Sequence, residues 1–398
     1  MNRNLMSLPT MAIFVLALLP GKETFATGQL MAIGIDNKFS YSEDTESYQW
    51  LEPGNDSVIF YDLEKPGTPE LIGSVVVDNS IIGPPTNIAI TPNQKLALIA
   101  NAVATESDES SATGFKMKPS NFISVVDLSL RPLRVIGKVG VGSMPSGISI
   151  DGAGKFAVVA NRNDSTVSVL SIDGTSVAVV DTINVGGGVT AVAISPDGRS
   201  AFAVKNKEHK IAVLKIEESG KVSYEGNDIP VGLYPWAITL SQDGSRAVVT
   251  NIGYKSASDG NTDTVSILDI SVSPPRVIQH LSVGDAPEGV AISPNGKFAA
   301  VSLLSGSFAV PKDAWYRKEV GRFSVLRLDG AQASVISTID VGSFPEGVAF
   351  SEDNTHIYVG NFASESLSIV SLNADGEVTR VKDIKLPGPP GSIRVANQ

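Results

Sequence analysis

The feature that most constrains this chain is a segment that recurs along it. The stretch "VGDAPEGVAISPNGKFAAVS" from Val283 returns from Val341 as "VGSFPEGVAFSEDNTHIYVG". Related segments begin earlier, at Pro84, Pro145, Val189 and Pro235. With anchors at residues 85, 145, 189, 235, 287 and 345, successive copies lie 44 to 60 residues apart. This period is typical of propeller blades and longer than that of short solenoid repeats.

Each copy predicts four short strands. A "GVAIS" strand leads through an Asp-Gly or Asn-Gly hairpin turn into a "KFAVVAN"-like strand. A third strand such as "TVSVLSI" and a fourth such as "VVDTINVG" follow. Val, Ile and Ala fill these strands, and no long stretch has a helical period. The repeat therefore predicts a four-stranded antiparallel blade.

Six copies are complete, and the two ends of the chain supply the parts of a seventh. The C-terminal "PPGSIRVANQ" from Pro389 is a lone first strand. The three missing strands are "QLMAIGI" (Gln29–Ile35), "DSVIFYDL" (Asp56–Leu63) and "ELIGSVVV" (Glu70–Val77). Pairing the last segment with the first removes exposed sheet edges. We predict an all-β, seven-bladed propeller that forms one domain over residues 27–398.

The repeat motifs resemble a known family. "AVVTN" (Ala247–Asn251), "IYVGN" (Ile357–Asn361) and the "PxGVAxSPDG" pattern are similar to the YVTN repeats of seven-bladed, WD40-like propellers. Members of that family are described as lactonase-like or as exported YncE-like proteins. The resemblance covers essentially all of residues 27–398. It implies a hydrolase or lyase that acts on a small cyclic ester, or a non-catalytic exported binding or interaction protein.

The N-terminus predicts export. Arg3 precedes the apolar run "MAIFVLALL" (Met11–Leu19), and "TFA" (Thr24–Ala26) is a suitable cleavage site, so residues 1–26 read as a signal peptide. The run is too short to span a bilayer, and no later run is long enough. We therefore expect a periplasmic or secreted monomer.

Composition limits the partners and cofactors. The chain has no cysteine, which excludes disulfides, covalent haem and thiolate metal sites. Its formal net charge of -11 disfavours nucleic acid and anionic membrane surfaces as partners. A small-molecule ligand remains the expected partner, and the cofactor, if there is one, stays unknown.

The resemblance places a ligand face on the rim that carries the connections between second and third strands. Four of these connections are long, at 36–55, 101–121, 251–263 and 303–321. Aromatic residues fall in predicted segments of this rim, namely Trp50, Trp236, Trp315, Tyr234 and Tyr254. We expect them either to form flat walls for a ring-containing ligand or to pack the loops onto the propeller.

The residue between Pro and Gly begins each innermost strand. At this position three neighbouring blades carry Trp236, Glu288 and Glu346, so these side chains should meet at the channel mouth. Two carboxyls that share one proton are suited to acid/base catalysis. The alternatives are a cation site or two solvated charges.

Two further candidates are cationic. Three residues beyond the Pro-x-Gly position, the other blades carry small residues, whereas the closing blade carries Arg394. Arg394 is a candidate anchor for a carboxylate or an oxyanion, with Glu346 as its expected protein partner. The alternative is that Arg394 frays into solvent. His209 is the lone imidazole on the rim and a candidate for proton transfer, or else part of an exposed hairpin tip.

The segment "DGNTD" has the alternating oxygen ligands of a calcium loop at Asp259, Asn261 and Asp263. It lacks the glycine and the terminal glutamate of the helix-flanked calcium loop, which favours a plain acidic loop. The three histidines are scattered and offer no pair for zinc, so no metal ligands are assigned.

Overall fold

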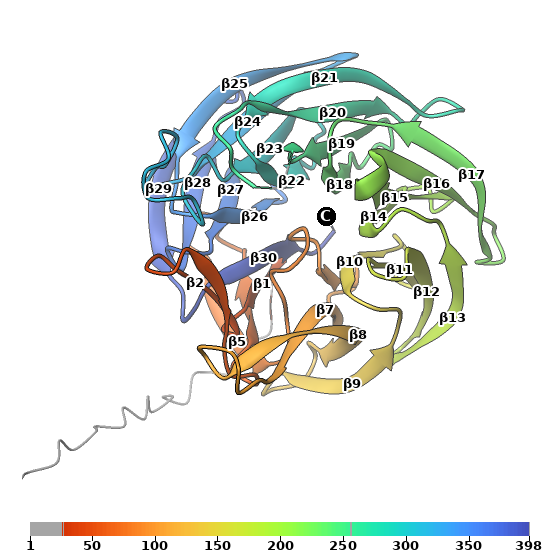
Figure 1. The fold of residues 1–398 in the computed structure, drawn as a ribbon. Helices are drawn as coiled ribbons and strands as arrows, with labels where there is room; N and C mark the ends of the chain where they lie inside the picture. Colours follow the sequence, from red (N-terminus) through yellow and green to blue (C-terminus); the bar gives the residue numbers. More distant parts are fainter. Residues whose placement is uncertain (1–25, 27, 255–256, 398) are drawn as a thin grey trace, which may run out of the picture.

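The computed structural model describes residues 26, 28–254 and 257–397, so that the predicted signal peptide lies outside the described residues except for Ala26. Seven four-stranded antiparallel sheets are arranged as blades around a central axis (Figure 1). This confirms the predicted seven-bladed propeller. In the described part of the chain, no helix has the length and hydrophobicity needed to cross a bilayer.

The six complete blades run from the inner to the outer strand in chain order. They are β6 (Ile88–Ile90), β7 (Leu96–Ser107), β8 (Phe115–Asp127) and β9 (Arg134–Gly140); β10 (Pro145–Ile150), β11 (Phe156–Asn161), β12 (Thr166–Asp173) and β13 (Ser176–Asn184); β14 (Val189–Ile194), β15 (Ser200–Lys205), β16 (Lys210–Ile216) and β17 (Val222–Pro230); β18 (Pro235–Leu240), β19 (Arg246–Asn251), β20 (Asp263–Asp269) and β21 (Arg276–Gly284); β22 (Pro287–Ile292), β23 (Phe298–Leu303), β24 (Arg322–Asp329) and β25 (Gln332–Asp340); and β26 (Pro345–Phe350), β27 (His356–Asn361), β28 (Ser366–Leu372) and β29 (Val378–Lys385). A short 3-10 helix, Asn206–Glu208, follows β15.

The closing blade joins the two ends of the chain. Its order is β30 (Pro390–Val395), β1 (Leu30–Ile35), β4 (Ser57–Asp62) and β5 (Glu70–Val76). β1 pairs with β30 in antiparallel register, with Ala32 opposite Arg394. Gln29 Nε2 also donates to the carbonyl of Ala396 at 2.9 Å. The closure predicted from the two orphan segments is therefore present.

The core lies between neighbouring blades, where branched side chains of one sheet pack on the next. Val325 and Phe323 of one blade, for example, pack with Val348 and Val359 of the following blade. Hydroxyl groups also link neighbouring blades close to the axis. Ser302 Oγ donates to the carbonyl of Glu346 at 2.6 Å, across a blade boundary. The inner ends of the blades are thus held together by polar as well as apolar contacts.

Two of the long rim connections are more regular than expected. Residues 36–55 contain a separate hairpin, β2 (Phe39–Ser42) and β3 (Ser47–Trp50). Residues 101–121 were expected to form a loop, but β7 and β8 continue as a long ribbon, with Val103 opposite Pro119. The expected loop is wrong here because the strand pairing extends past the blade and satisfies the backbone groups of the insertion.

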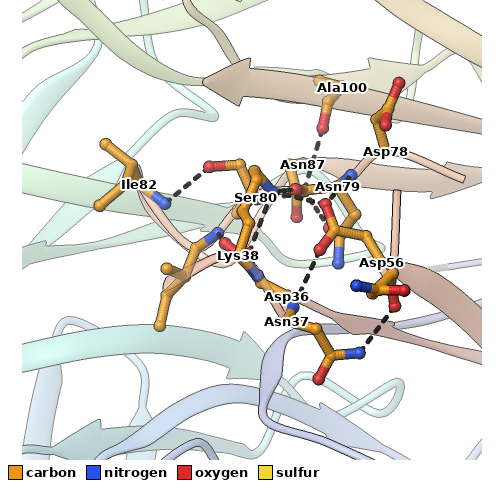
Figure 2. A network of polar contacts seen from close by, with 12 residues as sticks. Asp36, Asn37, Lys38, Asp56, Asp78, Asn79, Ser80, Ile82, Asn87 and Ala100 are labelled. Carbon is orange, nitrogen blue, oxygen red and sulfur yellow. Dashed lines mark hydrogen bonds and ion pairs between the residues drawn. The ribbon is translucent and has the colours of Figure 1, made fainter. Parts of the chain in front are cut away.

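A buried ionic network anchors the connection that leaves the closing blade (Figure 2). Lys38 Nζ contacts Asp36 Oδ1 at 3.0 Å and Asp56 Oδ2 at 2.6 Å, and it also donates to the carbonyl of Asn79. Asp36 Oδ2 accepts the Ile81 N–H at 2.8 Å. Burial raises the pKa of Asp56 to about 6, in spite of the Lys38 charge. The network holds the segment that carries Ile81 beside the channel, and sequence reasoning did not find it.

Candidate functional site

The innermost strands begin at one end of the channel, which we call the Pro-x-Gly mouth. The second residue of the motif is buried in each of the six complete blades. These side chains form a ring, namely Thr86, Ser146, Thr190, Trp236, Glu288 and Glu346. Glu288 is only 6% exposed and Glu346 only 2%. The alternative of two solvated charges is therefore wrong, because these carboxyls lie beneath the rim and not on it.

A repeated backbone feature shapes this mouth. The residue before the motif proline has a positive φ in several blades, for example 55° at Tyr234 and 52° at Ala286. Such a φ is uncommon for residues other than glycine. The carbonyl of Tyr234 accepts the N–H of Ile252 at 3.1 Å, and that of Met144 accepts the N–H of Arg162 at 3.1 Å. These bonds fix the residue just after each second strand beside the mouth.

The two glutamates form a coupled pair. Burial raises the pKa of Glu288 to about 8, and the Trp236 indole offsets part of that rise. Burial also raises the pKa of Glu346 well above its ordinary value, and the neighbouring Glu288 charge adds to this rise. Two like charges in a desolvated site cannot easily coexist. Burial and like-charge repulsion therefore favour a pair that keeps at least one proton at neutral pH.

Four buried polar atoms around this mouth have no hydrogen-bond partner among the described residues. They are Arg162 Nη1, Trp236 Nε1, Thr86 Oγ1 and Glu346 Oε2. The indole of Trp236 influences Glu288, but it makes no hydrogen bond of normal geometry. Buried polar groups in native proteins are nearly always paired. An arginine, an indole, a hydroxyl and a carboxyl that all lack partners indicate a site arranged for a ligand or for ordered water.

Arg162 is the residue of this site that sequence reasoning missed. Its guanidinium carbon lies 5.4 Å from the centre of the Trp236 ring. Burial lowers its pKa, while the neighbouring Tyr234 acts in the opposite direction. A signal was available in the repeats, because Arg162 follows the second strand directly. The equivalent positions in the other complete blades carry uncharged residues, namely Ala102, Asn206, Ile252, Leu304 and Phe362.

Of the predicted aromatic residues, Tyr234 joins Trp236 in this cluster. Their rings are stacked, with centroids 6.3 Å apart and an interplanar angle of 23°. His209 Nδ1 accepts the backbone N–H of Tyr234 at 3.0 Å. The structure therefore places His209 behind Tyr234, where it holds the backbone of this aromatic residue.

The hairpin β2–β3 carries further aromatic side chains toward the same mouth. Trp50 packs edge-on against Phe39 at 5.3 Å and belongs to the apolar cluster that includes Ile81 and Ile82. The charge of Glu288 contributes to a raised pKa of Tyr48, although burial is the largest cause. Trp50 thus lies in the packing of the hairpin, whereas Tyr48 approaches the carboxyl pair.

Trp315 and Tyr254 do not join the carboxyl pair. Trp315 is 82% exposed and packs edge-on against Tyr316 at 5.6 Å, next to Gly260. Tyr254 is 68% exposed. The rim aromatics therefore separate into a buried group around Trp236 and an exposed group on the outer loops.

Arg394 lies at the other end of the channel, so the expected pairing with Glu346 at one mouth is wrong. It lines a cavity together with the turns that join first and second strands, including Asp151 and Ser195. The reason is the length of the inner strand, because three residues beyond the motif correspond to about 10 Å along a strand. Only burial shifts the pKa of Arg394, to about 10, with no contribution from a carboxylate.

The proposed calcium loop is held by its own hydrogen bonds. Asp259 Oδ1 accepts the Asn261 N–H at 2.9 Å, and Asp263 Oδ2 accepts the Ala286 N–H at 3.0 Å. Burial is the main cause that raises the pKa of Asp263 to about 6. Among the described residues, no group of three or more His, Asp or Glu side chains is arranged to hold a metal ion.

Comparisons with known proteins agree with this architecture. A family model described as "Lactonase, 7-bladed beta-propeller" matches residues 52–236. This match confirms the resemblance to lactonase-like seven-bladed propellers. No curated protein matches the sequence.

Solved structures share the fold at low sequence identity. A putative 6-phosphogluconolactonase from Bacteroides uniformis has a TM-score of 0.68 and 14% identity, covering 92% of this chain and 99% of its own. The periplasmic gluconolactonase of Pseudomonas aeruginosa has a TM-score of 0.65 and 19% identity, with coverages of 92% and 98%. Hydrazine synthase of Kuenenia stuttgartiensis has a TM-score of 0.61 and 19% identity, with coverages of 79% and 90%. Such likeness shows the fold alone, and one fold supports several chemistries.

Proposed function

We propose that this lactonase-like propeller is an exported hydrolase that opens small lactones at the Pro-x-Gly mouth. The observation that carries the proposal is the buried pair Glu288 and Glu346, with the Trp236 indole next to Glu288 and the Arg162 guanidinium next to that indole. Among the described residues, Trp236 Nε1 and Arg162 Nη1 have no hydrogen-bond partner. The family match and the gluconolactonase neighbours support sugar lactones as the substrate class.

The arrangement fits the chemistry of ester hydrolysis. The reactive state has one glutamate ionised and the other protonated. The carboxylate takes a proton from a water molecule, and the oxygen of that water attacks the lactone carbonyl carbon. The Arg162 and Trp236 N–H groups are suited to stabilise the negative oxygen that develops. The ring C–O bond then breaks, the protonated carboxyl gives its proton to the leaving oxygen, and the product is a hydroxy acid.

Substrate entry requires the cover of the mouth to move. Trp236 is 9% exposed, and both glutamates are still more buried. Tyr48 on the hairpin β2–β3 is 56% exposed, and burial, Tyr41 and the Glu288 charge together raise its pKa. We therefore assign this hairpin as the part of the rim that a lactone displaces when it enters.

The proposal includes export of the protein from the cytoplasm. The pattern of residues 1–26 supports a cleaved signal peptide, and one neighbour in the same fold is a periplasmic gluconolactonase. We place the hydrolase in the periplasm or outside the cell. N-terminal sequencing of the secreted protein tests this, and a mature chain that still begins at Met1 contradicts it.

The test is hydrolysis of a panel of five- and six-membered sugar lactones by the purified protein, followed by acid release. Glu346→Gln and Glu288→Gln should each lower kcat by at least about a hundredfold, which is typical for loss of a general acid or base. Glu70→Gln changes an exposed glutamate of the outer strand β5 and should match the wild type. If wild type and both variants bind lactones equally and none is hydrolysed, the protein is the non-catalytic binding protein instead.

A further inference from the structure

The channel has a second opening that the proposed reaction does not use. At the turn mouth, where inner strands meet their Asp-Gly turns, a cavity of about 360 Å³ opens along the axis. Inner strands of five blades line it, and Arg394 lies in its wall together with Ala89, Ser149, Ala193 and Thr239. Strand β30, the innermost strand of the closing blade, runs toward the centre of the ring (Figure 1). A cavity of this size is in the range that holds a small ligand.

The guanidinium of Arg394 has no protein partner. Among the described residues it makes neither an ion pair nor a hydrogen bond. Asp151 is the carboxylate in the cavity wall, but its oxygens accept the N–H groups of Ala153, Lys155 and Phe156 in their own turn. Arg394 is only partly buried, so its guanidinium is open to the space of the cavity. A ligand that enters this space can therefore pair with the charge.

The other groups in the wall are small and partly polar. The Thr239 hydroxyl has no hydrogen bond to any described residue, and Ser149 Oγ accepts the Ile194 N–H at 3.0 Å while keeping its own proton to donate. The methyl groups of Ala89 and Ala193 face the same space. The cavity thus combines one cation, two hydroxyls and apolar surface.

We propose that this cavity is an anion site that binds a small aliphatic monocarboxylate, with Arg394 as its counter-ion. A carboxylate accepts two parallel N–H bonds from one guanidinium. The hydroxyls of Ser149 and Thr239 suit a hydroxyl-bearing chain, and the alanine methyls suit its carbon atoms.

The charge balance favours a carboxylate over phosphate. The cavity offers a single cation, and Asp151 brings a negative charge to its edge. Phosphate near neutral pH carries between one and two negative charges and usually recruits several cationic donors or backbone N–H groups. A monoanion matches Arg394 one to one.

The proposal is independent of the chemistry at the Pro-x-Gly mouth and can fail separately from it. The probes are acetate and lactate, titrated into the full protein by calorimetry, with chloride and phosphate as competitors. Arg394→Ala is the informative variant because four other blades carry alanine at the equivalent position, namely Ala89, Ala193, Ala291 and Ala349. It should fold and lose at least about tenfold in carboxylate affinity, as expected for loss of a bidentate charged pair.

The matched control is the double variant Glu288→Gln/Glu346→Gln, which changes only the opposite mouth and should keep carboxylate binding. Arg394→Ala should in turn keep lactone hydrolysis. Saturable binding of lactate and acetate that disappears in Arg394→Ala supports the site. Binding that survives in Arg394→Ala, the absence of saturable binding to the wild type, or tighter binding of phosphate or chloride than of either carboxylate overturns it.

Discussion

The carboxyl of Glu346 lies close enough to that of Glu288 for the Glu288 charge to raise the pKa of Glu346, in a site where burial already raises both. The two residues come from the same position of neighbouring blades, so the repeat itself brings them together. The same motif position in two neighbouring blades thus places two acidic side chains next to each other.

This pair should make the protein less stable as the pH rises. The folded-state pKa of Glu288 is about 8, against an ordinary value of 4.5, so the folded state holds more protons than the unfolded state between these values. Stability therefore falls from about pH 4.5 to about pH 8, by at most about 5 kcal/mol for this group. Urea midpoints of wild type and Glu288→Gln/Glu346→Gln should diverge as the pH rises, with the variant more stable at pH 9. A wild-type midpoint that rises over this range contradicts the raised pKa values.

We expect Arg162 to affect the rate of the reaction and not the stability of the fold. Arg162→Met removes a donor without a protein partner and should lower kcat by about a hundredfold or more, as expected for loss of an oxyanion donor. The control is Arg199→Met, because Arg199 is exposed in a first-to-second-strand turn at the other end of the channel. Steady-state kinetics on a sugar lactone make the measurement. Equal kcat values for the two variants remove Arg162 from the site.

Variants of His209 distinguish a role in positioning Tyr234 from a role in proton transfer. Its Nδ1 accepts the Tyr234 N–H, so His209→Asn, which keeps an acceptor, should retain most activity, whereas His209→Ala should raise KM by displacing Tyr234. The pH dependence of kcat/KM should be the same in wild type and His209→Asn. If His209→Asn is as inactive as a Glu346 variant, histidine is the proton carrier, as the sequence alone suggested.

Lys38 should matter for stability alone. Lys38→Met leaves Asp36 and Asp56 buried without their cation, which should cost about 3–5 kcal/mol. The triple change Lys38→Met/Asp36→Asn/Asp56→Asn removes the charges together and should recover much of that loss. Denaturant unfolding at pH 7 measures both proteins, and a single variant as stable as the wild type contradicts the role of the network.

Much of this architecture could be predicted because the repeat carries it. The Pro-x-Gly anchors gave the blade number, and the two orphan ends gave the closure that pairs β1 with β30. The approach of Glu288, Glu346 and Trp236 also followed from one shared position. The repeat did not predict how deeply a side chain is buried or how an insertion folds. The repeat does not show how deeply the glutamates are buried, and the regular ribbon at β7–β8 depends on pairing outside the blade.

Two arginines show what an aligned position in the repeat does and does not determine. Arg394 lies at the opposite mouth from Glu346 because three residues of an inner strand span about 10 Å along the axis. Arg162 was missed although the position after each second strand separates it from uncharged counterparts. Both residues stand out once each aligned position is compared across all blades.

The protonation state of Glu346 tests the central claim most directly. Difference infrared spectra of wild type minus Glu346→Gln at pH 7 report whether the side chain that was replaced was an acid or a carboxylate. The account predicts that the difference contains the C=O band of a protonated carboxylic acid, which fades only at alkaline pH. Carboxylate bands at pH 7 in its place would show that Glu346 is ionised and contradict the shared-proton pair.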